Sequence, residues 1–305
     1  MNVGLIGCGR WGMAHLSTLL HLKEQGAVSA IHVCDIDPNR LVNLPSGVDG
    51  AHTDIESMLA KTSPDFAAIA TPSHTHSDIG SMLLELEIPT LVEKPMGVNV
   101  SSLQQLIQSS RKAGTPFFSG YLLRHHSGFQ LAKQLLDVAN KPRMNTLSFF
   151  RHSTRAPPTD GDAVRRLASH AVDLLTFLGA PHSIPSIQVE ADESLGQVSI
   201  HLHFTDPHTP LEAHISVGWG FENERREATI QRGDDTYHLE FNVHDSIRIG
   251  PTSTGEVRMT ESKLPPLHAQ YLAAFHTVQM SEDQYSEYLQ TAHILDAIEA
   301  KIGSV

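Results

Sequence analysis

The sequence predicts an α/β protein of two domains: a doubly wound parallel sheet, then an α/β domain with an open, mostly antiparallel sheet. Three observations predict this class. A glycine-rich turn follows an apolar run at the start of the chain. Strand-like and helix-like segments then alternate up to about residue 120, as in βαβ units. Further on, alternating apolar runs follow one another without helices between them, which favours antiparallel pairing.

The first domain is expected at residues 1–120, where apolar runs and helical spacings take turns. The expected strands are 2–7, 28–34, 66–70, 90–93 and 116–120. The expected helices are 11–25, 55–61, 77–85 and 101–113. Asp37, followed by Pro38, and Asp54 are expected helix N-caps. Because helices separate the strands, right-handed crossovers and a parallel sheet follow.

The second domain is expected at residues 121–305, with a C-terminal helix that can pack back on the first domain. A polar, proline-rich stretch, 153–162, interrupts it. The expected strands are 145–151, 198–204, 211–217, 227–231 and 237–241, and the expected helices are 129–139, 164–178, 267–279 and 284–302.

The glycines of the opening turn have the spacing of a dinucleotide site. Gly7 permits the tight turn, Gly9 lets the backbone approach a pyrophosphate, and Gly12 lets helix and strand pack closely. Arg10 and Trp11 stand between them at the start of the helix, whose N–H groups favour phosphate. The alternative is a purely structural turn. The sequence context, a strand before and a helix after, favours a Rossmann fold with a bound cofactor.

An acidic residue supports that reading. Asp35 ends the second expected strand, 23 positions after Gly12. A carboxylate there accepts hydrogen bonds from ribose hydroxyls and repels a 2′-phosphate, so we expect NAD, with NADP less favoured. Arg40 is the nearby residue that can serve a 2′-phosphate instead.

Charge and cysteine content exclude several classes of protein. With 22 lysines and arginines against 34 acidic residues, the formal net charge is −12, which disfavours binding to nucleic acid or to an anionic membrane. The two cysteines, Cys8 and Cys34, define no disulfide framework. The sequence begins directly with MNVGLIG, so we expect no secretory signal and a cytoplasmic protein.

Four stretches together resemble the Gfo/Idh/MocA oxidoreductases, the family of glucose–fructose oxidoreductase and the inositol dehydrogenases. They are GCGRWG at 7–12, ATPSHTH at 70–76, EKP at 93–95 and GYLLR at 120–124. The resemblance implies a Rossmann domain, an open antiparallel sheet, homodimers or homotetramers, and reactions at a carbinol carbon of sugars and polyols.

The resemblance also implies site residues. It places Thr71, Pro72 and His76 near the cofactor, and Glu93 and Lys94 at the nicotinamide, with a bond before Pro95 that is often cis. From position alone, Lys94 follows the carboxyl end of an apolar strand, where doubly wound sheets bind ligands. An ammonium there can stabilise developing negative charge on a substrate oxygen. The alternative is a solvated loop lysine.

The second domain supplies the expected proton carrier. The family has Asp-x-x-x-His on a helix, and here the segment RLASH carries Arg166 in place of the aspartate, with His170 retained. His170 can act as general base, and Asp173 can orient it. Tyr121 and Arg124 are expected to contact the substrate. A packed or surface histidine is the alternative for His170.

Arg166 is the most informative departure from the family pattern. A cation on the face of His170 lowers the histidine pKa and suits a carboxylate or phosphate on the substrate. Arg151 and Arg155 precede the same helix and can converge on that group. The alternative is a solvated pair, Arg165 and Arg166, on the helix surface.

Other signals point to no site. His201 and His203 share a strand face, but no further ligands complete a metal set, so we expect no metal. Neither cysteine has a neighbouring base.

We therefore expect an NAD-dependent oxidoreductase acting on a CH–OH group or ketone of a sugar-like substrate, with an anionic group on that substrate as a finer expectation. Two alternatives stay open: a nucleotide-bound sensor without turnover, and a glycosidase or lyase that uses NAD transiently.

Overall fold

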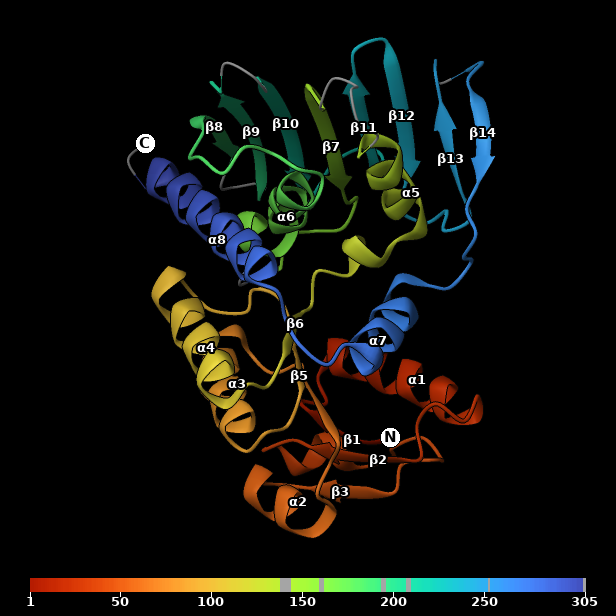
Figure 1. Cartoon of the computed structure of the whole chain (residues 1–305), viewed down its shortest axis with the longest axis vertical. Helices are drawn as coiled ribbons and strands as arrows, with labels where there is room; N and C mark the ends of the chain where they lie inside the picture. Colours follow the sequence, from red (N-terminus) through yellow and green to blue (C-terminus); the bar gives the residue numbers. More distant parts are fainter. Residues whose placement is uncertain (138–143, 159–161, 193–195, 207–209, 252, 304–305) are drawn as a thin grey trace. The chain divides into compact units, whose positions relative to one another are not determined.

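The computed structural model describes residues 1–137, 144–158, 162–192, 196–206, 210–251 and 253–303. The chain forms two compact units. Unit 1 consists of Met1–Leu122 and Leu267–Tyr285, and unit 2 consists of Leu123–Pro266 and Ser286–Val305 (Figure 1).

Unit 1 is built on a six-stranded parallel sheet. Its strands are β1 (Asn2–Ile6), β2 (Ala30–Cys34), β3 (Gly50–His52), β4 (Phe66–Ile69), β5 (Thr90–Val92) and β6 (Phe117–Ser119). The order β3-β2-β1-β4-β5-β6 is doubly wound. The expected parallel sheet is confirmed, and the loops that follow β1, β2, β4, β5 and β6 leave from the carboxyl edge, where ligands of such sheets bind.

Helices cover both faces of this sheet. They are α1 (Arg10–Glu24), α2 (Ile55–Thr62), α3 (His76–Glu85), α4 (Val100–Ala113) and α7 (Pro266–His276), with 3-10 turns at Pro38–Leu41, Ser73–Thr75 and Leu122–His125. In Figure 1, α3 and α4 lie together on one side, and α1 and α7 on the other. On α1, Leu16, Leu19 and Leu22 recur at helical spacing and are fully buried.

Unit 2 is built on an eight-stranded sheet in the order β14-β13-β12-β11-β7-β10-β9-β8. Its strands are β7 (Thr146–His152), β8 (Ser186–Asp192), β9 (Gln197–Phe204), β10 (Leu211–Gly218), β11 (Arg225–Arg232), β12 (Asp235–Glu240), β13 (Ser246–Ile249) and β14 (Glu256–Met259). Among the described strands of this sheet, only the β7–β10 pair is parallel. The expected mostly antiparallel sheet is therefore confirmed.

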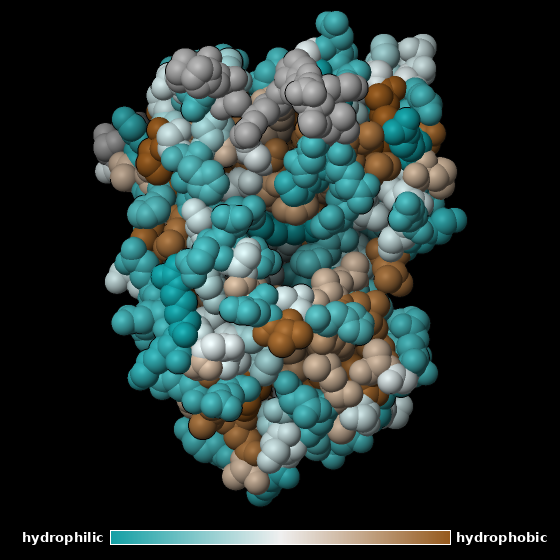
Figure 2. Space-filling model, in the orientation of Figure 1, coloured by the Kyte–Doolittle hydropathy of each residue, from teal (hydrophilic) through white to brown (hydrophobic). Residues whose placement is uncertain are grey.

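One face of this sheet is covered and the other is open. The helices α5 (Ser127–Leu136), α6 (Ser169–Phe177) and the later part of α8 (Glu282–Ile302) lie over one face (Figure 1). Burial alternates accordingly on β9, where Ile200 and Leu202 are buried and His201 between them is exposed. Ile215 on the neighbouring strand β10 is buried as well. Figure 2 shows hydrophilic residues over much of the drawn face, with hydrophobic residues in smaller patches.

Several elements differ from the sequence prediction. The strands β3, β8, β13 and β14 were not predicted. The expected helix at 164–178 begins as a π-helical turn over Val164–Ala168, because apolar spacing does not separate i→i+5 from i→i+4 hydrogen bonding. Pro38 starts a 3-10 turn instead of an α-helix, although Asp37 does cap it through the Asn39 amide. The end of the expected helix at 129–139 lies outside the described residues.

Candidate cofactor and substrate sites

The turn after β1 has the shape that a dinucleotide phosphate requires. Gly7 has a φ of 98°, and a Cβ there would lie 2.7 Å from the backbone of Ala70. A Cβ on Gly12 would lie 1.9 Å from the Gly7 carbonyl oxygen. On Gly9 it would meet, among the described residues, only the Arg40 guanidinium at 3.3 Å. Gly7 and Gly12 therefore bring strand and helix together, while Gly9 leaves the loop surface accessible to a pyrophosphate.

The first turn of α1 completes this cradle. Gly9 is its N-cap, and within the described part of the chain no side chain caps the helix. Arg10 and Trp11 follow, and both are exposed. An uncapped N-terminus presents backbone N–H groups and the positive end of the helix dipole to an anion. The residues present thus fit the phosphates of NAD.

Asp35 sits at the carboxyl end of β2 and is 6% exposed. One carboxylate oxygen accepts from the Cys8 amide at 2.7 Å, and the other from the Asp37 amide at 2.9 Å. The Arg40 guanidinium lies 3.5 Å from Asp35 and 3.7 Å from Asp37. The backbone thus fixes the carboxylate beside the glycine loop, and each oxygen keeps a lone pair for a ribose hydroxyl.

His76 joins the loops after β4 and β5. Its buried ring lies between the Thr71 carbonyl, 2.8 Å from Nε2, and the Pro95 carbonyl, 2.7 Å from Nδ1. The Thr71 hydroxyl contacts that of Thr75 at 2.7 Å. Pro72 is the residue before the 3-10 turn and is exposed. These contacts set the conformation of both loops at the ligand-binding edge of the sheet.

Glu93 directly follows β5 and belongs to a buried polar cluster that sequence reasoning missed. Its carboxylate accepts from His15 Nε2 at 3.1 Å, and His15 Nδ1 lies 2.7 Å from the Tyr271 hydroxyl of α7. Burial raises the pKa of Glu93, but hydrogen bonds from His15 and Trp11 and the charges of His15 and Lys94 lower it overall. A carboxylate is therefore held ionised beneath the loop that carries Lys94.

The position of His15 in the sequence is the one signal that could have predicted this cluster. It stands on α1 one residue before Leu16, on the face that packs against the sheet, and is completely buried. A histidine on a buried face needs polar partners. No local pattern indicates that Tyr271, 256 residues further on, supplies one of them.

Lys94 and Tyr121 occupy corresponding places at the edge of the sheet. Lys94 comes two residues after β5, is partly exposed, and its bond to Pro95 is cis. Its amide donates to the Glu93 carboxylate at 3.1 Å. Tyr121 comes two residues after β6 and is 3% exposed. Both lie where a doubly wound sheet holds its ligand.

His170 is the second residue of α6 and is 2% exposed. The π turn that precedes it contains Arg166, which is partly exposed. The α-helical i,i+4 relation between Arg166 and His170 does not carry over to a π turn. Arg165 instead binds α8, with Asp296 2.8 Å away and a bidentate contact to Glu299.

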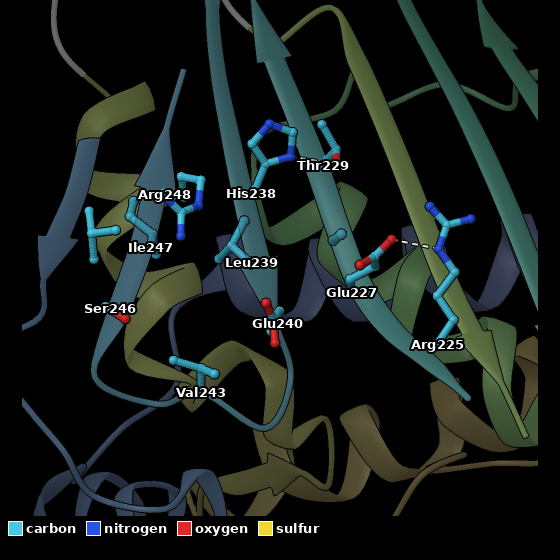
Figure 3. Close-up of a pocket in the computed structure, with 12 residues that line it drawn as sticks. Arg225, Glu227, Thr229, His238, Leu239, Glu240, Val243, Ser246, Ile247 and Arg248 are labelled. Atoms are coloured by element: carbon cyan, nitrogen blue, oxygen red, sulfur yellow. Dashed lines mark hydrogen bonds and ion pairs between the residues drawn. The ribbon is translucent and has the colours of Figure 1, made fainter. Parts of the chain in front are cut away.

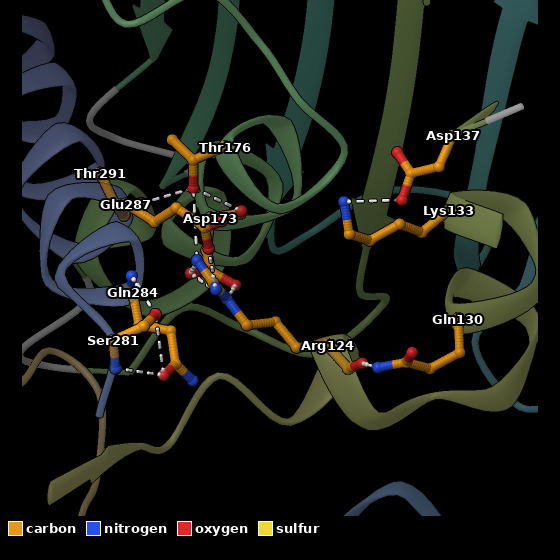
Figure 4. A network of polar contacts seen from close by, with 10 residues as sticks. All are labelled: Arg124, Gln130, Lys133, Asp137, Asp173, Thr176, Ser281, Gln284, Glu287 and Thr291. Carbon is orange, nitrogen blue, oxygen red and sulfur yellow. Dashed lines mark hydrogen bonds and ion pairs between the residues drawn. The ribbon is translucent and has the colours of Figure 1, made fainter. Parts of the chain in front are cut away.

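Arg124 and Asp173 form a buried ion pair in unit 2 (Figure 4). The guanidinium donates to Asp173 at 2.8–2.9 Å and also pairs with Glu287. Thr176 lies 3.3 Å from the guanidinium. Burial raises the pKa of Asp173 to about 6, an effect that Arg124 partly offsets. Burial lowers the pKa of Arg124, but Asp173 and Glu287 raise it above its usual range overall.

A pocket opens on the uncovered face of the unit 2 sheet, across β11, β12 and β13 (Figure 3). It has a volume of about 380 Å³ and is lined by Arg225, Glu227, Thr229, His238, Glu240 and Arg248, among others. The Arg225 guanidinium contacts Glu227 at 2.5 Å and lies 3.4 Å from the centre of the Phe150 ring. This face mixes both signs of charge with an aromatic ring.

The remaining histidines and cysteines singled out from the sequence contact other residues or are buried. His201 stacks on His214, and His203 lies 3.5 Å from Glu212. The described residues include no group of three or more histidine, cysteine or acidic side chains arranged for a metal. Burial raises the pKa of Cys8 to about 11 and of Cys34 to about 12, so neither is a thiolate at neutral pH. In the described parts, no helix has the length and apolar character of a membrane span.

The doubly wound sheet, the glycine cradle and Asp35 define unit 1 as a dinucleotide-binding Rossmann domain. Residues 1–121 match the family model described as "Oxidoreductase family, NAD-binding Rossmann fold", that of Gfo/Idh/MocA. The family expected from the motifs is thus the one whose model matches this domain, and the match supports NAD as the cofactor of the domain.

Relatives of known activity are distant. Inositol 2-dehydrogenase 2 of Saccharopolyspora erythraea is 24% identical over 58% of this chain and 53% of its own. The 1-carboxy-3-chloro-3,4-dihydroxycyclohexa-1,5-diene dehydrogenase of Comamonas testosteroni is 28% identical over 58% of this chain and 47% of its own. The chain thus spans about half the length of these curated relatives.

Solved structures match along the whole chain. An oxidoreductase from Agrobacterium radiobacter, solved with NAD⁺, L-tartaric acid and magnesium, has a TM-score of 0.77 at 16% identity, covering 99% of this chain and 96% of its own. At this level of identity, the match confirms the two-part fold.

Proposed function

We propose that the protein is an NAD-dependent dehydrogenase or reductase acting on a secondary hydroxyl or ketone of a sugar or polyol. The observation that carries the proposal is the carboxyl edge of the unit 1 sheet. There the glycine cradle and Asp35 provide a site for the cofactor, and Lys94 follows the strand β5 of the same edge. The names of the inositol dehydrogenases among its relatives support this substrate class.

Two side chains of this chain would carry the proton and charge chemistry. Lys94 donates a hydrogen bond to the substrate oxygen, and His170 accepts the hydroxyl proton as the alcohol becomes a ketone. The bound nicotinamide supplies the hydride acceptor for oxidation, so that one proton is left on His170. In reduction, both transfers run in reverse.

Cofactor preference follows from Asp35. Its carboxylate is fixed by two backbone amides and would repel a 2′-phosphate at close range, so NAD is preferred over NADP. Arg40 lowers this repulsion because it lies 3.5 Å from the same carboxylate. We therefore expect the protein to bind NAD more tightly than NADP without excluding NADP, and Asp35 to be the main cause of the difference.

The substrate is proposed to carry an acidic group. Arg166 stands where the family motif has an aspartate, and a cation there favours a carboxylate or phosphate. Two names support this: the Comamonas relative acts on a carboxy compound, and the Agrobacterium structure contains tartaric acid. Comparison of D-glucuronate with D-glucose, in the wild type and in Arg166→Ala, tests this role of Arg166.

The proposed activity is tested by NADH formation over a panel of polyols and sugars, with and without acidic groups. Lys94→Ala and His170→Ala should each lower kcat by at least about a hundredfold and leave NAD affinity unchanged. Lys112→Ala, an exposed lysine of the same unit, is the matched control. Wild-type turnover in either active-site variant would refute that residue's role.

The same panel separates the alternatives. NAD binding without turnover of any substrate would identify a sensor. The replacement of the motif's aspartate by Arg166 favours this alternative. Cleavage of a glycoside without net NADH would identify a hydrolase or lyase that uses NAD transiently.

A homo-oligomer in the cytoplasm completes the proposal. The open face around Arg225 and Glu227 carries opposite charges that a second copy can complement. Sedimentation of the wild type, Arg225→Glu and the control Arg155→Glu tests this face. An unchanged oligomer in Arg225→Glu would exclude it.

A further inference from the structure

Arg151 lies on the covered face of the unit 2 sheet. It belongs to β7, where Leu147 and Phe149 alternate with solvent-side residues and are both fully buried. With a period of two, Arg151 points to the same side as these residues. In the ladder it stands opposite Val217 of β10 and opposite Arg226 of β11. The Arg151 guanidinium therefore follows Leu147 and Phe149 on the same face of β7, near the end of the strand.

Three other shielded arginines of unit 2 pair with carboxylates, and the half-buried Arg248 donates to the Gly255 carbonyl at 3.1 Å. Arg124 binds Asp173 and Glu287, Arg165 binds Asp296 and Glu299, and Arg232 binds Asp235 at 2.9 Å. Arg151 has no carboxylate at ion-pair distance among the residues that the structure describes. Arg151 therefore differs from these four described arginines, each of which has a carboxylate or carbonyl partner.

The surroundings of Arg151 disfavour its charge. Burial, and to a lesser extent the Arg226 charge, lower the pKa of Arg151 to about 10. Like charges directly opposite in a sheet repel each other, and Glu224, 3.3 Å from Arg226, is exposed and pairs with that residue. An enclosed cation without a counterion costs stability. Proteins keep unpaired charged residues of this kind at binding sites, where a ligand supplies the opposite charge.

Arg151 is still accessible, because the residue is only half-buried. A guanidinium offers a planar fork that matches the two oxygens of a carboxylate. A phosphate carries more charge and more acceptor oxygens than one fork satisfies. Val217, the residue opposite on β10, offers no polar group to a ligand.

We propose that Arg151 is the residue that binds the carboxylate of an acidic sugar substrate. The proposal rests on the proposed dehydrogenase function with an acidic substrate. It adds that the acidic group is the carboxylate of a sugar acid and that Arg151, in place of Arg166, selects it. Arg166, in the π turn, is the competing residue for the same role.

The test compares binding and stability in Arg151→Gln, Arg151→Lys, Arg166→Ala and the control Arg258→Gln, which changes an exposed arginine of β14. Calorimetric titration of the NAD-loaded protein measures affinity for D-glucuronate, D-glucose and D-glucose 6-phosphate. We expect tighter binding of glucuronate than of either other ligand. Arg151→Gln should lose about ten- to a hundredfold of the glucuronate affinity and none of the glucose affinity. Arg151→Lys should retain part of the glucuronate affinity, and Arg258→Gln should retain all of it.

Thermal unfolding gives an independent readout. If Arg151 is an enclosed cation awaiting a ligand, Arg151→Gln without ligand should unfold at the same or a higher temperature than wild type. A clear fall would indicate a structural arginine and overturn the proposal. Glucuronate affinity that is unchanged in Arg151→Gln, that depends on Arg166 alone, or that is exceeded by glucose 6-phosphate would also overturn it.

The two proposals fail separately. Equal NADH formation from neutral and acidic sugars in wild type and Arg151→Gln would leave the dehydrogenase standing and refute the role of Arg151. Glucuronate binding that depends on Arg151, without turnover, would support the anion site and refute the dehydrogenase.

Discussion

Replacing Asp173 by asparagine should make the stability of unit 2 less dependent on pH. Asp173 is completely buried, and burial raises its pKa from 3.8 to about 6 despite the partial offset from Arg124. Below about pH 4 the carboxyl is protonated in both folded and unfolded chains. Between pH 4 and 6 the folded protein alone keeps the proton, so wild-type stability falls as pH rises through this window. Asparagine cannot titrate and escapes that loss.

The magnitude follows from the shift of about two pKa units. Each unit corresponds to 1.36 kcal/mol, so the free energy of unfolding of Asp173→Asn, relative to wild type, should rise by about 3 kcal/mol between pH 4 and 7. Other titrating groups contribute to both proteins and cancel in the difference. Asp137→Asn, an exposed aspartate paired with Lys133, is the control and should show almost no pH-dependent difference.

Urea unfolding at several pH values measures this difference. The chain has two tryptophans, so in a Trp11→Phe background the fluorescence of Trp219 reports on unit 2 alone. A difference that stays constant with pH would refute the reasoning. A difference that falls as pH rises would mean that attraction to Arg124 outweighs burial and that the Asp173 pKa is lowered.

Three further changes test unit 1. Asp35→Ser should reduce the preference for NAD over NADP by about tenfold or more, measured by fluorescence titration of both cofactors, since it removes the repulsive carboxylate; an unchanged ratio would refute the assignment. Gly12→Ala should abolish folding of unit 1 or NAD binding, seen by circular dichroism and titration, because its Cβ would lie 1.9 Å from the Gly7 oxygen; a native-like variant would contradict the cradle. Glu93→Gln should lower the free energy of unfolding by about 1–3 kcal/mol, measured in urea, since His15 loses an ionised acceptor; a neutral effect would argue against the cluster.

The sequence predicted those parts of the fold that local patterns encode. Apolar runs and helical spacings placed five of the six strands of unit 1. The spacing of Gly7, Gly9 and Gly12 predicted the glycine turn, in which a Cβ on Gly7 or Gly12 would collide with the backbone. β3 was missed because its three residues, GAH, form no buried apolar run of the kind that marked β5 and β6. β14 was missed because its four residues, EVRM, are all exposed and form too short a run for their alternation to stand out from a loop.

The site could be predicted only as far as neighbours in sequence determine it. Positions after strands, such as Lys94 and Asp35, follow from topology. Partners that lie far along the chain do not. Arg124 was read as a substrate contact, and nothing local showed that Asp173 and Glu287, 49 and 163 residues further on, engage its guanidinium. The sequence indicates only that Arg151 precedes the helix, because the absence of a carboxylate near it among the described residues depends on how the chain folds.

The charges in unit 1 also bear on how the proton and hydrogen-bond roles divide. Glu93 is buried and ionised, and the Lys94 charge contributes to lowering its pKa. Electrostatic attraction is mutual, so the Glu93 carboxylate and the Lys94 ammonium attract each other. An ammonium has three donors and no acceptor, which suits a group that holds a substrate oxygen and prevents it from taking up a proton. If the protein is a dehydrogenase, proton acceptance therefore falls to a neutral base, and His170 is the residue of the family motif that this chain retains.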